Sequence, residues 1–314
     1  MKLLVLGAAG QVGRELTTAL AGLGEVIAAT RNGRLANGGA GIAADLADAV
    51  SLRAALEQVG ADVIVNAAAY TAVDRAEDEP EAADRVNHRA VAEIGAWAKA
   101  SGALVVHYST DYVFDGSGLD GRGTRPYRED DPTAPLGVYG RSKLAGENAL
   151  RDSGAAHLIF RTAWVYAAHG HNFLRTMLRL GAEREELRVV ADQIGAPTPA
   201  RWIARVTAEA VARHQAALAD GGPVPEGIFH LVAAGRCSWF EFAEAILHGA
   251  AERGLIARAP RVLPIATADY PTRARRPAWS VLDCGRLKSA FGLELADWRA
   301  GLGEVLGEIA ASSD

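Results

Sequence analysis

The sequence predicts an α/β protein with a Rossmann-type, doubly wound parallel sheet and a smaller α/β C-terminal lobe that would bind the substrate. Short apolar runs alternate with helical patterns through the first half of the chain, as in successive βαβ units. A glycine-rich turn, Gly7-Ala-Ala-Gly-Gln-Val-Gly13, follows the first apolar run and opens a helical pattern. We therefore expect a first domain over residues 1–165 and a second lobe over residues 166–314, with some segments of the lobe returning to the first domain.

Composition excludes several classes of protein. At 314 residues with 49% apolar content, the chain can bury a large core. Its formal net charge of −5 and pI near 5.9 argue against a nucleic-acid binder. No apolar run approaches the roughly 20 residues that span a bilayer, and no signal-peptide pattern is visible, so we expect a cytoplasmic protein with no membrane partner. Only Cys237 and Cys284 are present, which excludes a disulfide scaffold, and they lack metal-ligand spacing.

The glycine turn is the first candidate binding feature. Residues 2–7 predict a strand and residues 14–23 a helix. This order places backbone N–H groups and the positive end of a helix dipole where a pyrophosphate can bind. The spacing is Gly-x-x-Gly-x-x-Gly and not the commoner Gly-x-Gly-x-x-Gly, so the prediction depends on its position after the first strand.

The end of the second predicted strand, residues 25–29, bears on the choice of cofactor. An acidic residue there would bind the ribose 2′-hydroxyl of NAD, whereas an arginine can accommodate the 2′-phosphate of NADP. This chain has Thr30-Arg31 at that place. The pattern favours NADPH, although a solvated surface arginine explains Arg31 equally well.

The next segments lead to the carboxyl edge of the predicted sheet. Asp45 lies before a helix that ends near residue 59, where it either contacts an adenine or caps the helix. A strand over residues 62–66 runs into small residues that let a ligand approach the backbone. A helix follows over about residues 80–101, and we interpret its Asn87 as structural.

The strongest catalytic pattern lies between residues 104 and 147. Tyr139 and Lys143 are four residues apart in a helical segment, so both side chains project from one face. A nearby ammonium favours the phenolate and lowers a tyrosine pKa, which prepares Tyr139 for proton transfer. Thr110 ends the apolar run 104–110 and can bond to the same oxygen. Tyr-x-x-x-Lys also occurs by chance on helix surfaces, but the glycine turn and the strand favour the catalytic interpretation.

The remaining segments supply weaker hypotheses. Residues 115–135 predict a long loop, which we interpret as a lid. Trp164 follows a strand over residues 157–162 and is either a wall for a sugar or a core residue. The basic run 273–276 can hold a diphosphate or simply be solvated. Further helices are predicted over residues 172–185, 201–218, from 238, and 287–309, with short strands over 187–190 and 227–232 and a fixed turn over 192–198; residues 310–314 should fray.

Six blocks in the same order resemble those of the extended short-chain dehydrogenases/reductases, and within them the dTDP-4-dehydrorhamnose reductase family. The resemblance covers nearly the whole chain. The blocks are Gly7-Ala-Ala-Gly-Gln-Val-Gly13, Asn66-Ala-Ala-Ala-Tyr-Thr-Ala-Val-Asp74, His107-Tyr-Ser-Thr-Asp-Tyr-Val-Phe114, Tyr139-Gly-Arg-Ser-Lys-Leu-Ala-Gly-Glu147, Phe160-Arg-Thr-Ala-Trp-Val-Tyr166 and Asp192-Gln-Ile-Gly-Ala-Pro-Thr198.

That resemblance implies reduction of the C4 ketone of dTDP-4-dehydro-β-L-rhamnose, the last step of dTDP-rhamnose biosynthesis. Tyr139 would give the proton, Lys143 would bind the nicotinamide ribose and tune Tyr139, and Thr110 would assist. The implied cofactor is NADPH, with NADH as the alternative. The second lobe would bind the sugar nucleotide. The protein would be a monomer or a homodimer. The cofactor residues implied by the resemblance are Gly10, Gln11, Val12, Asp45, Leu46, Ala69, Tyr70, Thr71, Tyr108, Tyr139 and Lys143. The glycine turn adds Gly7 and Gly13 to the predicted cofactor residues, and the end of the second strand adds Arg31. The substrate residues implied by the resemblance are Thr110, Asp111, Tyr139 and Trp164.

Some features leave alternatives open. The family often has His where Tyr70 stands, and usually Asn where this chain has Trp279. Some members use Mg²⁺, which enters here by resemblance only, because the sequence shows no carboxylate cluster to assign to it. Two other functions compete: reduction of another nucleotide-linked 4-keto-6-deoxy sugar, and a non-catalytic role like that of the regulatory subunit of methionine adenosyltransferase. The intact set of Thr110, Tyr139 and Lys143 argues against the second.

Overall fold

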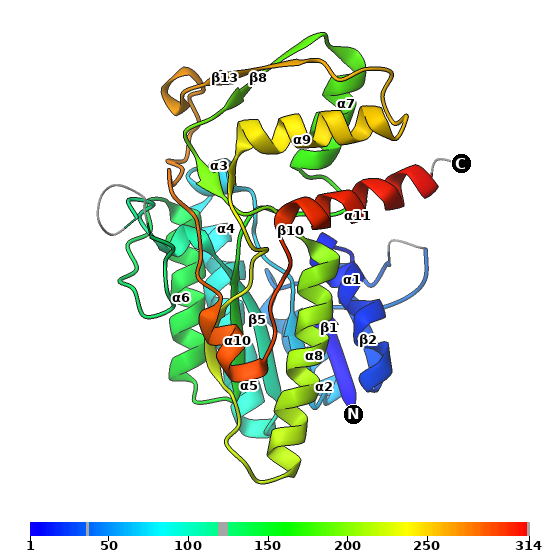
Figure 1. Cartoon of the computed structure of the whole chain (residues 1–314). Helices are drawn as coiled ribbons and strands as arrows, with labels where there is room; N and C mark the ends of the chain where they lie inside the picture. The colour runs from blue at the N-terminus through cyan, green and yellow to red at the C-terminus, as the bar shows by residue number, and fades with distance from the viewer. Residues whose placement is uncertain (36–37, 119–124, 313–314) are drawn as a thin grey trace.

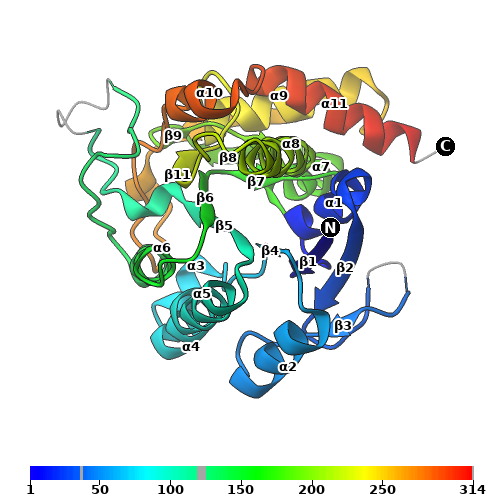
Figure 2. The same cartoon turned by 90° about the horizontal axis from the view of Figure 1, so that it is seen from below.

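A seven-stranded parallel sheet forms the centre of the computed structural model, which describes residues 1–35, 38–118 and 125–312. The strand order is β11-β6-β5-β4-β1-β2-β3, and the chain changes direction across the sheet between β1 and β4 (Figures 1 and 2). Such a switch point leaves a crevice at the carboxyl ends of the strands, where ligands bind. The strands are β1 (Lys2–Leu6), β2 (Glu25–Thr30), β3 (Ile42–Ala43), β4 (Val63–Asn66), β5 (Leu104–Thr110), β6 (His157–Thr162) and β11 (Gly227–His230).

Helices cover both faces of this sheet, as Figure 2 shows. Because successive residues of a strand point to opposite faces, β1 contributes Leu3 and Val5 to one buried cluster and Leu4 and Leu6 to the other. On the first face lie α1 (Gln11–Ala19) and α8 (Ala200–Ala219); on the second lie α2 (Ala49–Val59), α5 (Ala90–Ser101) and α6 (Val138–Asp152), with α3 (Val73–Ala76), α4 (Pro80–Asp84) and the π-helical turn η2 (Arg85–Arg89) beside them.

The second half of the chain adds a group of helices and short strands beyond the carboxyl edge of the sheet (Figure 1). Two-stranded pairs hold it together, and β13 pairs in parallel with β8. Its elements are β7 (Val165–Tyr166), α7 (Phe173–Glu183), β8 (Glu186–Val190), β9 (Ile194–Gly195), β10 (Thr198–Pro199), β12 (Cys237–Ser238), α9 (Trp239–Glu252), β13 (Arg261–Ile265) and α11 (Trp298–Ala311). By contrast, α10 (Gly285–Phe291) packs beside β11, where Phe291 contacts Phe229. The 3-10 turns of the described chain include η1 (Ala21–Leu23), η3 (Asp111–Val113) and η4 (Thr267–Asp269).

The predicted fold class is confirmed, and the structure corrects some local details. The predicted helix over residues 287–309 is two helices, because Gly292 ends α10 at φ +60° and the Asp297 side chain caps α11. Asp48, and not Asp45, caps α2 by accepting a bond from the Val50 N–H. The helix predicted over residues 80–101 contains the π-helical turn η2.

The structural interpretation of Asn87 is confirmed. Its amide accepts from the Tyr70 N–H at 2.8 Å and donates to the Tyr70 carbonyl at 3.0 Å and to the Ser142 hydroxyl at 3.0 Å. It therefore fixes the loop after β4 against α6.

Other predictions stay open. The division at residue 165 stays a prediction, although β11 joins the first sheet from the second half of the chain. Residues 36–37 of the glycine-rich loop, 119–124 of the predicted lid and 313–314 of the predicted frayed end lie outside the described residues. Within the described ranges, none of the helices combines the length and apolar character needed to cross a membrane.

Candidate active site

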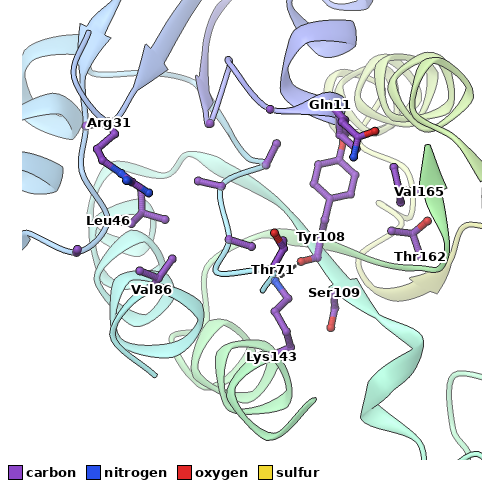
Figure 3. Close-up of a pocket in the computed structure, with 18 of the residues that line it drawn as sticks. Gln11, Arg31, Leu46, Thr71, Val86, Tyr108, Ser109, Lys143, Thr162 and Val165 are labelled. Carbon is purple, nitrogen blue, oxygen red and sulfur yellow. Dashed lines mark hydrogen bonds between the residues drawn. The ribbon is translucent and has the colours of Figure 1, made fainter. Parts of the chain in front are cut away.

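A pocket of about 440 Å³ opens at the carboxyl ends of β1, β4 and β5 (Figure 3). It lies at the switch point of the sheet, where this fold class binds dinucleotides. The lining residues are Gly7, Gly10, Gln11, Val12, Arg31, Ala44, Asp45, Leu46, Ala47, Ala67, Ala68, Ala69, Thr71, Val86, Tyr108, Ser109, Tyr139, Lys143, Thr162 and Val165.

The glycine turn forms one wall of the pocket because only glycine fits its close approaches. Gly7 has φ +79°, and a Cβ there would lie 2.7 Å from the Ala68 nitrogen. A Cβ at Gly13 would lie 2.1 Å from the Gly7 carbonyl oxygen, so α1 can pack directly on the turn. The N-cap Gly10 has no side chain to bond the first N–H groups of α1, which leaves them available to an anion in the pocket.

Arg31 and Lys143 mark opposite parts of the pocket. Arg31 lies next to Leu46 and Val86 beyond β2, and Lys143 reaches up from α6 beside Tyr108 (Figure 3). A dinucleotide could place its adenosine near Arg31 and its nicotinamide near Lys143. Its pyrophosphate would then lie beside the glycine turn. This order matches the sequence of adenosine, pyrophosphate and nicotinamide in NADP.

The Lys143 side chain is buried, with 2% of the residue exposed. Its Nζ donates to the Tyr108 carbonyl oxygen at 2.5 Å and lies 3.3 Å from His107 Nε2. Burial lowers the pKa of Lys143 to about 8, and the negative charge of Glu147 partly opposes this.

Tyr139 lies one helical turn before Lys143, and both line the pocket. Burial raises the pKa of Tyr139, which a hydrogen bond with Thr110 only partly offsets. The expectation that Lys143 lowers the pKa of Tyr139 is therefore wrong for this arrangement, because the amine is directed to Tyr108 and desolvation dominates. The ring of Tyr112 packs edge-on against Tyr139, with 5.6 Å between centroids.

Thr110 and Asp111 follow directly at the end of β5. The Thr110 hydroxyl donates to Asp111 Oδ1 at 3.0 Å and accepts from the Tyr112 N–H at 3.2 Å. Asp111 is 3% exposed, and its Oδ2 has no hydrogen-bond partner among the described residues. Burial raises the pKa of Asp111 to about 6, although the nearby Ser280 and Thr110 hydroxyls oppose this shift.

Comparison with known proteins now decides the family. The family described as "RmlD substrate binding domain" matches residues 1–311. The dTDP-4-dehydrorhamnose reductase of Burkholderia thailandensis is 50% identical over 310 residues, which cover 96% of this chain and 97% of the relative. The chain belongs to the dTDP-4-dehydrorhamnose reductases. It is an NAD(P)H-dependent oxidoreductase of the extended short-chain dehydrogenase/reductase class, acting at the final step of dTDP-rhamnose synthesis.

Other relatives agree with this family assignment. The reductase of Escherichia coli K12 is 44% identical over 309 residues, covering 98% of both chains. The crystal structure of the Clostridium acetobutylicum reductase superposes with a TM-score of 0.84 at 33% identity, over 98% of this chain and 99% of that one. The Bacillus anthracis reductase, solved in complex with NADP, has a TM-score of 0.84 at 31% identity over the same shares.

Trp164 packs against the second half of the chain, and its role as a wall for a sugar stays a prediction. One face stacks on Trp239 with 3.5 Å between ring centroids, and a Cβ on Gly195 would lie 2.5 Å from the Trp164 ring. Its backbone is held at φ +49°, a strained value for a tryptophan. The side chain of this reductase's Trp164 is half-buried and does not line the pocket described above.

Two arginines of the basic run 273–276 in this reductase are paired with carboxylates. Arg276 bonds Asp74 at 2.7 Å and the Tyr112 hydroxyl at 3.3 Å, and Arg273 pairs with Asp78. These contacts tie the second half of the chain to α3 and the turn that follows it. Trp279 also makes a structural contact: its indole N–H donates to the Arg125 carbonyl at 3.0 Å.

Most of the predicted cofactor residues of this reductase come together in the pocket, and a few do not. Gly13 lies beneath the turn, and the Tyr70 hydroxyl donates to Glu79 at 2.8 Å. The predicted site residues outside the pocket lining are Gly13, Tyr70, Thr110, Asp111 and Trp164.

Eight lining residues were not among the individually predicted site residues. Two of them, Ser109 and Thr162, carry buried hydroxyl oxygens with no partner in the described structure, as expected of groups that bind a ligand. Their positions at the carboxyl ends of predicted strands were the available signal. The eight residues are Ala44, Ala47, Ala67, Ala68, Val86, Ser109, Thr162 and Val165.

The pocket residues fit a nicotinamide dinucleotide. The uncapped start of α1, the Arg31 guanidinium and the two unpartnered hydroxyls supply a donor set suited to phosphates and ribose. For the Mg²⁺ that the resemblance suggests, no group of three or more His, Cys, Asp or Glu side chains in the described residues is arranged to hold a metal ion.

Proposed function

We propose that this reductase converts dTDP-4-dehydro-β-L-rhamnose to dTDP-β-L-rhamnose with NADPH, and that Tyr139, Lys143 and Thr110 carry out the proton transfer. The observation that supports this most is the position of Tyr139 and Lys143, which line one pocket with the glycine turn and Arg31. A proton donor and a dinucleotide cradle then adjoin a single space, as ketone reduction requires.

The direction of the reaction suits the state of Tyr139. The bound dihydronicotinamide supplies a hydride to the C4 carbon. Tyr139 gives its proton to the C4 oxygen, and burial, which raises the pKa of Tyr139, keeps the phenol protonated at neutral pH. Thr110 holds the phenol and the developing alkoxide in place through its hydroxyl. Lys143 binds the nicotinamide ribose and brings positive charge close to Tyr139.

Arg31 supports NADPH over NADH. It lies exposed on the pocket wall after β2, where a 2′-phosphate of bound adenosine is expected. A guanidinium binds a phosphate with charge-assisted, often bidentate hydrogen bonds. NADH lacks that phosphate and would lose the contact.

Substrate binding is proposed beyond the end of β5. Asp111, which has a buried and unpartnered carboxylate oxygen, directly follows β5, and the half-buried Trp164 lies two residues after the end of β6. A sugar nucleotide bound there would place its C4 ketone near Tyr139. Both a monomer and a homodimer are compatible with this proposal.

The test is a reduction assay with purified dTDP-4-dehydro-β-L-rhamnose. Loss of NADPH absorbance that requires the sugar, with dTDP-β-L-rhamnose identified as product, is the expected result. Parallel assays with other nucleotide-linked 4-keto-6-deoxy sugars measure the competing substrates. A higher kcat/KM with one of those sugars would replace the proposed substrate, and no turnover with any would remove the proposal.

A further inference from the structure

Behind Lys143, three buried side chains form a hydrogen-bonded row that links β4, β5 and α6. Asn66 Nδ2 lies 3.2 Å from His107 Nδ1, and His107 Nε2 lies 3.3 Å from Lys143 Nζ. Asn66 is 1% exposed, His107 is 0% and Lys143 is 2%. The proposed chemistry does not use Asn66 or His107.

The backbone determines which end of the Asn66 amide faces His107. The Ala68 N–H donates to Asn66 Oδ1 at 3.2 Å, so this atom must be the carbonyl oxygen. The Asn66 NH₂ group therefore points at His107 Nδ1 and donates to it. A neutral imidazole that accepts at Nδ1 carries its proton on Nε2.

That proton points at the Lys143 nitrogen. An ammonium group has three N–H donors and no lone pair, so it cannot accept the Nε2–H. A neutral amine can accept it and still donate to the Tyr108 carbonyl, which lies 2.5 Å away. The neutral form of Lys143 is thus the one that satisfies this row of hydrogen bonds.

The charges around Lys143 do not reverse this preference. From its own helix, Glu147 faces it, but that carboxylate is held by Arg161 through bonds of 2.9 and 2.7 Å. From β5, His107 is kept neutral, because burial holds its pKa well below the ordinary value. The phenol of Tyr139 is protonated, and the Tyr108 hydroxyl is bonded to Thr207 at 2.7 Å.

We propose that Asn66 and His107 favour the neutral amine form of Lys143 when no dinucleotide is bound, and that dinucleotide binding is therefore coupled to proton uptake by Lys143. The inference rests on the proposed contact between Lys143 and the cofactor. The phosphates and ribose oxygens of the ligand bring negative charge and new acceptors, which favour the ammonium form. Asn66 and His107 are positioning residues in this scheme.

The coupling links the positive charge of Lys143 to the presence of a bound dinucleotide. A buried ammonium facing an N–H donor would destabilise the empty pocket. Once the dinucleotide is bound, the same charge lies one helical turn from Tyr139 and stabilises the phenolate that forms as the proton leaves. Cofactor occupancy and the acidity of Tyr139 are then linked.

The direct test is calorimetry of NADPH binding to the unmodified enzyme in buffers that differ in ionisation enthalpy. The slope of observed enthalpy against buffer ionisation enthalpy gives the number of protons taken up. With the pKa of Lys143 rising from about 8 to its ordinary value, we expect about 0.25 proton at pH 7.5 and about 0.9 at pH 9. Both values of pH lie above the titration of the 2′-phosphate, near pH 6. Above pH 8, the apparent Kd for NADPH should increase with pH, approaching a tenfold increase for each pH unit.

Substitutions in the row test whether Asn66 and His107, and not other titrating groups, cause the proton uptake. Asn66→Asp places an acceptor opposite Nδ1, which moves the proton to Nδ1 and turns Nε2 into an acceptor for the ammonium; we expect proton uptake at pH 9 below about 0.2. His107→Met removes the N–H and should reduce uptake by at least half. The control is His157→Gln, at the start of β6, where Nδ1 contacts the Ala155 carbonyl; uptake there should match the unmodified enzyme.

The outcomes distinguish this inference from the proposed function. NADPH binding with no proton uptake by the unmodified enzyme at pH 9 would overturn the inference and leave the reductase proposal intact. Undiminished uptake in a folded Asn66→Asp or Lys143→Met variant would also overturn it. Failure of NADPH to bind the unmodified enzyme would overturn both.

Discussion

Arg161 and Glu147 form a buried, two-bond ion pair that joins β6 to α6, the helix that carries the proposed catalytic residues Tyr139 and Lys143. The Arg161 Nε and Nη2 atoms donate to the two Glu147 carboxylate oxygens at 2.9 and 2.7 Å, and the side chains are 3% and 1% exposed. The guanidinium also lies over the Phe114 ring, 5.1 Å from its centroid. The pair fixes α6, and with it Tyr139 and Lys143, against the sheet.

Glu147→Gln should strongly destabilise the protein. The substitution leaves the Arg161 guanidinium buried without a counter-charge, which costs about 3–5 kcal/mol. Urea unfolding at pH 7.5 measures this loss. Glu183→Gln is the matched control, because the Arg179–Glu183 pair is exposed and its loss should cost less than about 1 kcal/mol. Equal effects of the two substitutions would contradict the structural role of the buried pair.

Tyr139→Phe should retain NADPH binding and lose most turnover. The hydroxyl acts on the proton and not on dinucleotide affinity, so we expect kcat to fall about 10²–10⁴-fold while the Kd for NADPH stays within about twofold. Tyr166→Phe is the control, since its buried hydroxyl has no hydrogen-bond partner in the described structure. A normal kcat in the Tyr139 variant would remove Tyr139 from the mechanism.

Arg31→Ala should change cofactor preference. Removing a charge-assisted contact with the 2′-phosphate costs about 1.5–3 kcal/mol, or roughly 10- to 150-fold in kcat/KM for NADPH. The value for NADH should change less than about twofold. Arg34→Ala, which alters a nearby exposed arginine outside the pocket lining, should leave the ratio unchanged. An unchanged NADPH to NADH ratio in the Arg31 variant would show that Arg31 is a solvated surface residue.

Asp111→Asn should stabilise the protein at pH 7.5. The folded pKa of Asp111 is raised to about 6, so the folded state binds this proton more tightly than the unfolded state does. Its contribution to stability is fully present below the unfolded pKa near 4 and is lost as pH rises through about 6. The neutral amide should therefore gain up to about 3 kcal/mol at pH 7.5 and little below pH 4.

Urea unfolding of both proteins across pH 4–7.5 tests the Asp111 prediction. Substrate affinity should fall in the variant because the carboxylate is a proposed sugar contact. A gain that does not depend on pH would contradict the raised pKa, since it would show that ionisation of Asp111 is not the cause.

Much of the fold could be predicted from local patterns. The strand, glycine turn and helix at residues 2–19 are successive along the chain, and their geometry depends on neighbours in sequence. The spacing of Tyr139 and Lys143 likewise determines that they share a helix face. The break before α11 was missed because Gly292 and Asp297 act as separate caps within an otherwise helical composition.

By itself, the sequence determined the class of sheet, and it located the proposed dinucleotide cradle and the proposed catalytic pair, because each depends on residues close together in the chain. Only the tertiary structure decided what those groups contact. Lys143 bonds to a carbonyl 35 residues away, and Arg276 pairs with a carboxylate 202 residues away. Burial by distant segments, which no local pattern records, raised the pKa of Tyr139 and directed the buried amine toward Tyr108 and His107.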